Sequence, residues 1–316
     1  MNSKYPLLII FQFVFIIYFP TDSFAQNKTA SNNLSNQLMA ISSQSSWQMT
    51  DSVKLKFNAF HTQGMIKVGD YFYLSSVEIQ QATKRYSVPQ NGYDRDTGKG
   101  VGHVFKIDKN GQLIKDIVVG EGDVYHPGGI DFDGKYIWVA VAEYRPNSRS
   151  VFYRIPIDTE EVETLFSFQD HIGAVVVNNE KNQLIAASWG AEKLYTLKLK
   201  NRRKPSVRKS RMSTNRFRYI DYQDSQYAGN GMMFGSGIKH YTHPDGTRYT
   251  LGGWQLTELK TMHSVWQLPV TGFSPGSGQS LVQNPCFIEP HKEGIKAWFA
   301  PDDDLHTVIY GFYISK

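Results

Sequence analysis

A short pattern that recurs along the chain constrains its fold more than any other feature. In five passages a small residue precedes an apolar one, and two strands rich in β-branched and aromatic residues follow, separated by a polar turn. The passages are 61–65, 126–130, 171–175, 228–232 and 283–287, and their small residues are Gly64, Gly129, Ala174, Gly231 and Cys286. Strand units that repeat in this way are typical of a β-propeller. The sequence therefore predicts an all-β fold, a single five-bladed β-propeller.

The end of the chain predicts how the ring of blades closes. The fifth unit offers only three strands, over 286–288, 296–299 and 308–314. An alternating segment over 53–57, just ahead of the first repeat, would supply the missing outer strand. An N-terminal strand that completes the C-terminal blade removes the open sheet edges that favour aggregation. We expect five blades, or six if residues 206–222 form a degenerate one.

The first 25 residues resemble an export signal rather than part of the fold. Lys4 precedes an apolar run over 7–19, which is shorter than the ~20 residues of a membrane-spanning helix, and a small-x-small cleavage pattern follows at 23–25. We predict a signal peptide over 1–25, a flexible leader over 26–46 and a propeller domain over 47–316. The protein would be secreted or periplasmic, and not an integral membrane protein after cleavage. An uncleaved anchor is the alternative.

Composition narrows the classes of function. Cys286 is the single cysteine, so no disulfide forms within the chain, and we expect this side chain to be buried rather than catalytic. The net charge is +5, and residues 200–211 contain seven basic residues and no acidic one. Such a run binds anionic glycans or lipid headgroups, or it is a solvated outer strand. Nucleic acid is not an expected partner because no aromatic residue interleaves the run.

Propeller geometry converts sequence position into a predicted site. Residues that start the inner strands and residues that end the second strands lie on one face of the disc, near the axis. Three of the five passages begin there with a histidine: His61, His126 and His171. Three imidazoles from consecutive blades can bind one divalent metal ion, which acidifies water or polarises a carbonyl. Alternatively, these histidines only hydrogen-bond neighbouring loops around a tunnel.

Other side chains are expected on the same face. As catalytic residues we predict Glu143 or Glu78 as general base and Arg145 as a clamp for a substrate carboxylate or phosphate, although Arg145 can equally form a surface ion pair. The predicted substrate-binding residues are Trp189, Ser188, Trp254, Gln283 and Gln63. The sequence has no Gly-x-Ser-x-Gly motif, no nucleotide-binding glycine fingerprint and no His-Glu-x-x-His motif. No nucleotide cofactor is therefore expected.

Four segments carry a resemblance to known proteins. Residues 60–65, 126–131, 170–174 and 187–190 resemble a family of exported β-propeller proteins of unknown function, over about residues 50–316. A weaker likeness, limited to Gln63, Gly64 and the blade pattern, is to the plant-type glutaminyl cyclases, which are five-bladed propellers. Those enzymes carry an acidic residue before the glycine of the second inner strand, where this chain has Gly128. Gluconolactonase-like and strictosidine-synthase-like propellers are similar in having an axial metal, which carboxylates and Asn hold.

Together these patterns predict a monomeric, exported propeller with a polar axial pocket for a small molecule or glycan. The leading hypothesis is a metal-assisted hydrolase or lyase that acts on a small extracellular molecule. One alternative is a non-catalytic binding module for a glycan, peptide or surface partner. Another is a cyclisation activity like that of glutaminyl cyclase. The fold alone does not choose between them, because propellers serve all of these roles.

Overall fold

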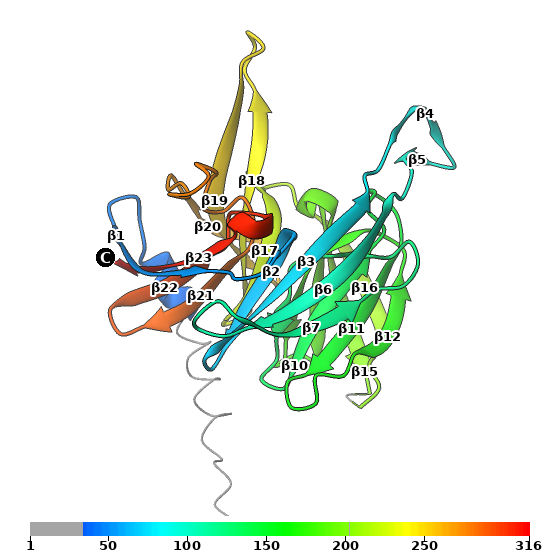
Figure 1. Cartoon of the computed structure of the whole chain (residues 1–316), viewed down its shortest axis with the longest axis horizontal. Helices are drawn as coiled ribbons and strands as arrows, with labels where there is room; N and C mark the ends of the chain where they lie inside the picture. Colours follow the sequence, from blue (N-terminus) through cyan, green and yellow to red (C-terminus); the bar gives the residue numbers. More distant parts are fainter. Residues whose placement is uncertain (1–33, 202) are drawn as a thin grey trace, which may run out of the picture.

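Five antiparallel sheets stand around a common axis in the computed structural model, which describes residues 34–201 and 203–316 (Figure 1). The predicted all-β, five-bladed propeller is confirmed. The strands of the middle layers are largely buried. For example, all but the first of the residues in β10 (Tyr136–Ala142) are buried, because neighbouring blades cover both of its faces.

The strands are named here blade by blade, from the axis outward. Blade 1 contains β2 (His61–Val68), β3 (Tyr71–Gln81), β6 (Lys99–Ile107) and β7 (Leu113–Val119). Blade 2 contains β8 (His126–Pro127) with β9 (Asp131–Phe132), then β10, β11 (Ser150–Pro156) and β12 (Glu163–Phe168). Blade 3 contains β13 (Ile172–Asn178), β14 (Gln183–Ser188), β15 (Lys193–Lys200) and β16 (Ser206–Thr214). Blade 4 contains β17 (Asp221–Gly229), β18 (Met232–Thr242), β19 (Arg248–Glu258) and β20 (His263–Pro269).

Blade 5 joins the two ends of the described chain. It contains β21 (Cys286–His291), β22 (Gly294–Phe299) and β23 (Val308–Ser315), and its outer strand is β1 (Ser46–Lys54). The predicted closure by an N-terminal strand is therefore confirmed, although β1 begins before and ends three residues short of the expected segment 53–57. No sixth blade forms from 206–222 in the described chain, because these residues contain β16 and the start of β17.

The segment ahead of β1 differs from the flexible leader expected over 26–46. Residues 34–39 form a helix. Leu34, Leu38 and Ile41 are buried in the apolar core between blades 4 and 5. Their spacing of four and three residues places them on one helical face, so burial of that face orders the segment. The predicted signal peptide over 1–25 and the rest of the leader lie outside the described residues, among which no helix is long and apolar enough to cross a membrane.

Close packing of the inner strands explains the recurring small residue. A Cβ added to Gly64 would lie 2.6 Å from the Ile130 nitrogen, and one added to Gly129 would lie 2.6 Å from Asp224 Oδ1. The prediction that Gly231 is the small residue of the fourth inner strand was wrong. Gly231 lies in the turn between β17 and β18, with open space around it. The inner strand of blade 4 is the preceding segment, whose polar residues concealed it, and Asp224 is the residue that meets the axis there.

Candidate functional site

Three histidines, one from each of blades 1, 2 and 3, lie together at one end of the propeller axis. His61 opens β2, His126 opens β8 and His171 directly precedes β13. The ring centroids of His126 and His171 are 6.0 Å apart. The pKa of His126 is lowered well below its usual value, first by burial and then by the nearby His171 and His61, whose protonation would disfavour a second positive charge. We call these three residues the histidine cluster.

A carboxylate orients His61. Its Nδ1 lies 3.0 Å from Asp303 Oδ2, and Asp303 Oδ1 accepts hydrogen bonds from the Thr62 amide at 3.1 Å and from Asn284 Nδ2 at 2.9 Å. The His61 and Asp303 side chains are 37% and 40% exposed. Because an ionised carboxylate only accepts hydrogen bonds, Nδ1 of His61 donates, and Nε2 of the neutral ring keeps its lone pair.

A backbone carbonyl orients His171 in the same way. Its Nδ1 donates to the carbonyl oxygen of Glu143 at 2.8 Å, so Nε2 carries the lone pair. The edge of its ring meets Trp189, with centroids 4.7 Å apart. Burial lowers the pKa of His171 to about 4, and the positive charge of Arg95 acts in the same direction. His171 is therefore a neutral hydrogen-bond acceptor at physiological pH.

His126 is the exception within the cluster. Its ring is 5% exposed and stacks on Tyr144, with centroids 4.2 Å apart. Neither ring nitrogen has a hydrogen-bond partner among the described residues. A buried polar atom without a partner costs about 1–3 kcal/mol, so such atoms are uncommon in folded proteins. Because both nitrogens are also buried from solvent, the described residues leave their hydrogen-bonding capacity unused.

A hairpin inserted in blade 1 reaches the residues beside the cluster. It consists of β4 (Arg85–Gln90) and β5 (Tyr93–Arg95) and projects from the propeller between β3 and β6 (Figure 1). The Arg145 guanidinium lies 3.5 Å from the centre of the Tyr93 ring, and that of Arg95 lies 5.2 Å from the centre of the Trp189 ring. The hairpin therefore adds two aromatic and cationic pairs to the site. The long connection between β3 and β6, from Gln81 to Lys99, is the sequence signal by which it could have been found.

The carboxylates predicted as general bases are occupied by other partners. Arg145 donates from Nε and Nη2 to Glu143 Oε2, at 2.8 and 2.7 Å. This is the ion pair that we considered as the alternative for Arg145. Glu78 Oε2 lies 4.0 Å from Nε2 of His103. The side chains of His61 and Asp303, at 37% and 40% exposed, are more accessible than Glu143 at 12% and about as accessible as Glu78 at 36%.

The predicted substrate-binding residues differ in their contacts and in their distance from the histidine cluster. Trp189 contacts His171, as described above. Ser188 Oγ accepts a hydrogen bond from the Lys193 amide at 3.0 Å, and the Gln63 amide donates to the Thr62 carbonyl at 3.1 Å. Gln283 is partly exposed in the loop ahead of β21.

Trp254 lies away from the cluster. It is fully buried in the core of blades 4 and 5 and stacks on Trp47, with ring centroids 5.0 Å apart. It belongs to the third strand of its blade rather than the second. Trp254 was predicted on the second strand because β17 was not recognised as the first strand of the blade.

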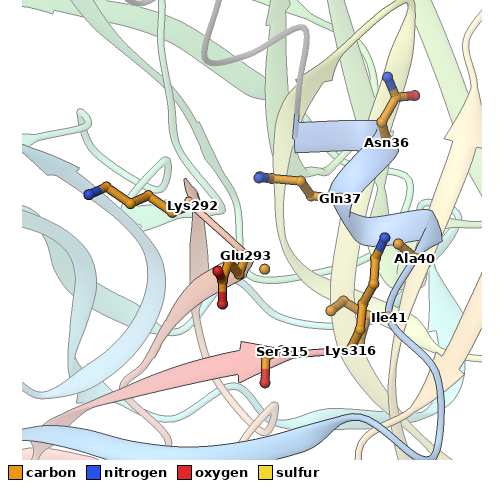
Figure 2. Close-up of a pocket in the computed structure, with 9 residues that line it drawn as sticks. Asn36, Gln37, Ala40, Ile41, Lys292, Glu293, Ser315 and Lys316 are labelled. Atoms are coloured by element: carbon orange, nitrogen blue, oxygen red, sulfur yellow. The ribbon is translucent and has the colours of Figure 1, made fainter.

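Two cavities occur elsewhere on the molecule. One of about 560 Å³ lies between the helix over 34–39 and the turn of β21 and β22; Figure 2 shows Gln37, Glu293 and Lys316 at its wall. The other, of about 230 Å³, is lined by residues that include Phe217 and His263. Neither lining includes a member of the histidine cluster.

The fit of the cluster to a metal ion is partial. Imidazoles whose Nδ1 atoms are held by a carboxylate and a carbonyl are typical of metal ligands, because Nε2 is then the donor. Within the described ranges, however, no three His, Cys, Asp or Glu side chains are grouped closely enough to hold a metal ion. The donor chemistry therefore suits a metal, whereas the spacing does not.

The chain is similar to one protein family along most of its length. Residues 17–314 match the model of a family described as a family of unknown function, DUF6454. No curated protein matches the chain.

Several solved structures resemble the chain at low sequence identity. The tail fibre of Staphylococcus aureus phage P68 is 9% identical with a TM-score of 0.45, over 85% of this chain and 53% of that one. A luciferin-regenerating enzyme is 7% identical with a TM-score of 0.44, over 85% and 96%. The hydrazine synthase of Kuenenia stuttgartiensis is 11% identical with a TM-score of 0.38, over 78% and 57%. The chain spans less than two thirds of the tail fibre and of hydrazine synthase, and these likenesses carry no argument about activity.

Proposed function

The chain belongs to DUF6454, a family of unknown function, and from its own residues we propose that it is an enzyme, a hydrolase or lyase that acts on a small molecule at the histidine cluster. The observation that carries this proposal is the His126 ring, which is buried without a hydrogen-bond partner among the described residues. A ring needed only for packing would be replaced by an apolar side chain without loss. A ligand that bonds to it accounts for its presence.

His61 is the general base in this proposal. Its Nε2 takes a proton from water or from the substrate, and the Asp303 carboxylate at Nδ1 stabilises the imidazolium that forms. Two further hydrogen bonds fix Asp303, so the ring is held in one orientation. The same imidazolium then returns its proton to the leaving group. Acid–base assistance of this kind contributes about 10²- to 10⁴-fold to a rate.

The surrounding side chains would bind the substrate. His171 Nε2 and the His126 ring nitrogens offer hydrogen bonds to a polar group. The rings of Trp189 and Tyr144, whose centroids are 5.7 Å apart, offer apolar faces. The cationic groups of Arg95 and Arg145 lie beside them, already paired with Asp94 and Glu143. This arrangement suits a small substrate that combines an apolar ring or chain with polar groups.

The test is a turnover assay with a panel of lactones, esters and cyclic amides. A matched control exists, because His243 and Asp245 form a similar pair at 3.1 Å on an exposed turn. We expect His61→Gln and Asp303→Asn each to lower kcat at least about 10²-fold on an accepted substrate, and His243→Gln to leave it unchanged. Equal rates for His61→Gln and His243→Gln would overturn the proposed role of His61.

Metal-assisted chemistry is the second form of the proposal, favoured by the anchored Nδ1 atoms of His61 and His171. Elemental analysis of the purified protein beside the triple variant His61→Ala, His126→Ala, His171→Ala tests it. Stoichiometric metal that is lost in the variant would support a metal site. Equal metal content in both proteins would contradict one.

A non-catalytic binding module is the competing function, because an unpartnered buried imidazole suits a bound ligand as well as a reacting one. The two functions separate in the same assay. A panel compound that raises the Tm of the wild-type protein but not of His126→Leu, and that is not turned over, would favour the binding module. Turnover that depends on His61 would favour the enzyme.

A further inference from the structure

The outer strand of blade 3 and its neighbour carry an unusual surface, which we call the basic edge. Its members share exposure to solvent and a positive charge; they are Lys198, Lys200, Arg203, Lys204, Arg208, Lys209 and Arg211. Within the described chain none of these side chains forms an ion pair or a side-chain hydrogen bond. No acidic residue lies between Lys193 and Thr214 to balance them.

The register of the two strands places like charges together. Lys198 on β15 stands directly opposite Lys209 on β16, and Arg211 stands opposite Thr196. Like charges directly opposite each other on antiparallel strands repel and destabilise the sheet. A strand that served only as a solvated edge would be more stable with one of these lysines replaced. The repulsion therefore points to a partner that neutralises the charge.

The basic edge is ordered rather than a loose tail. The carbonyl of Arg203 accepts a hydrogen bond from Arg154 Nη2 at 2.6 Å, which ties the turn between β15 and β16 to blade 2. β16 is the outermost strand of its sheet and pairs only with β15. The backbone that carries these cations is thus held by its pairing with β15 and by the bond at Arg203.

The shape and chemistry of the basic edge indicate which class of anionic partner it binds. A line of cations matches a linear polymer better than a flat membrane, which meets many side chains over an area. Proteins that bind single-stranded nucleic acid use aromatic side chains on which bases stack, and no aromatic residue occurs between Leu197 and Asn215. We infer that the basic edge binds a linear acidic polysaccharide, a chain whose sugars carry carboxylates or sulfates.

This inference is independent of the proposed activity, and binding measurements test it. The probes are dextran sulfate, polygalacturonate and neutral dextran, with anionic phosphatidylglycerol vesicles and a single-stranded oligonucleotide for comparison. We expect the wild-type protein to bind both acidic polysaccharides, with a Kd that rises steeply with salt concentration, and not to bind neutral dextran.

Two variants with equal net charge separate the basic edge from overall charge. The test variant is Lys198→Gln, Arg208→Gln, Lys209→Gln, Arg211→Gln, and the control is Lys56→Gln, Lys84→Gln, Lys109→Gln, Lys260→Gln, at exposed lysines elsewhere. We expect the test variant to bind at least about 10-fold more weakly at low salt, and the control less than about 2-fold more weakly. The Tm of both variants should match or exceed that of the wild type. Equal weakening of the two variants, or tighter binding of the wild type to vesicles or to the oligonucleotide than to the polysaccharides, would overturn the inference.

Discussion

Two sets of ionisable side chains are buried near the propeller axis. The carboxylates of the first set have hydrogen-bond partners, whereas His126 in the second has none among the described residues. Asp131 on β9 and Asp224 on β17 are carboxylates whose oxygens accept hydrogen bonds from backbone amides. His126, near one end of the same axis, has no such partner among the described residues. Burial disfavours the charged form in both sets. It raises the pKa of Asp131 to about 7 and lowers that of His171 to about 4.

The carboxylates join blades that are distant in the sequence. Asp131 Oδ2 accepts from the amides of Val177 in blade 3 and Tyr227 in blade 4, at 2.9 and 3.1 Å. Asp224 Oδ2 accepts from the Met65 amide in blade 1 at 2.9 Å. These bonds cross the axis and fix the inner strands. The comparison teaches that burial of a polar group does not itself indicate function, because Asp131 and Asp224 are buried for a structural purpose.

Removal of an axial carboxylate should have the largest effect on stability. In Asp131→Ala, the buried amide of Val177 and the partly buried amides of Phe132 and Tyr227 lose this acceptor. Each such loss costs about 1–3 kcal/mol, so we expect the free energy of unfolding to fall by at least ~3 kcal/mol. Urea denaturation measures this, with Asp245→Ala on an exposed turn as the control. A loss no larger than that of the control would show that the carboxylate does not hold the blades.

Close packing at the axis gives the next largest effect. In Gly129→Ala the new methyl group would lie 2.6 Å from Asp224 Oδ1 and 3.0 Å from the Ala174 Cβ. Overpacking of this kind typically costs about 1–3 kcal/mol. Gly173→Ala is the matched control, because its nearest contact would be 3.7 Å away. If thermal unfolding shows the same Tm for both variants, the inner strands are not packed as described.

The pH dependence of stability should separate the two sets, since their contributions have opposite signs. The pKa of His171 is lower in the folded state than its usual 6.5, so its contribution to stability is lost as the pH falls from about 6.5 to about 4. The pKa of Asp131 is higher than its usual 3.8, so stability is lost as the pH rises from about 3.8 to about 7.

We therefore expect His171→Gln to change how the free energy of unfolding depends on pH. Without the histidine, stability should decrease more steeply as the pH rises from 4.5 to 6.5, by on the order of 2 kcal/mol relative to the wild type. Urea midpoints across this range measure it, with His240→Gln on the exposed part of β18 as the control. A His171→Gln profile parallel to that of the wild type would contradict the lowered pKa.

The fold was largely predictable because it depends on local patterns. Alternating apolar residues and turns repeat along the chain, and the missing strand of the last blade predicted the closure by β1. Blade 4 was misaligned, because polar residues in β17, among them Asp221 and Asp224, hide an inner strand. Asp224 accepts its hydrogen bond from the Met65 amide in blade 1, which no local pattern reveals. The helix over 34–39 was missed because only its packing on blades 4 and 5 distinguishes it from a polar leader.

The candidate site was predictable in its position but not in its chemistry. Equivalent positions in successive repeats identified His61, His126 and His171 as neighbours. The pairing of His61 with Asp303 depends on a contact across 242 positions of sequence, and that of Tyr93 with Arg145 depends on an inserted hairpin. Neither leaves a local pattern. Trp254 was predicted to line the site but is a core residue. It was placed there because β17 was not recognised, so that the third strand of blade 4 was taken for the second.

Substitution of His126 tests the central claim most directly, and it should have the smallest effect on stability. His126→Leu removes two buried polar atoms that have no partner among the described residues, at the expense of the stacking on Tyr144. We expect the free energy of unfolding to stay unchanged or to rise by up to about 1 kcal/mol, while turnover and ligand-induced stabilisation are lost. A variant that is about 2 kcal/mol less stable but retains both would show that His126 is a structural residue, and would contradict the account.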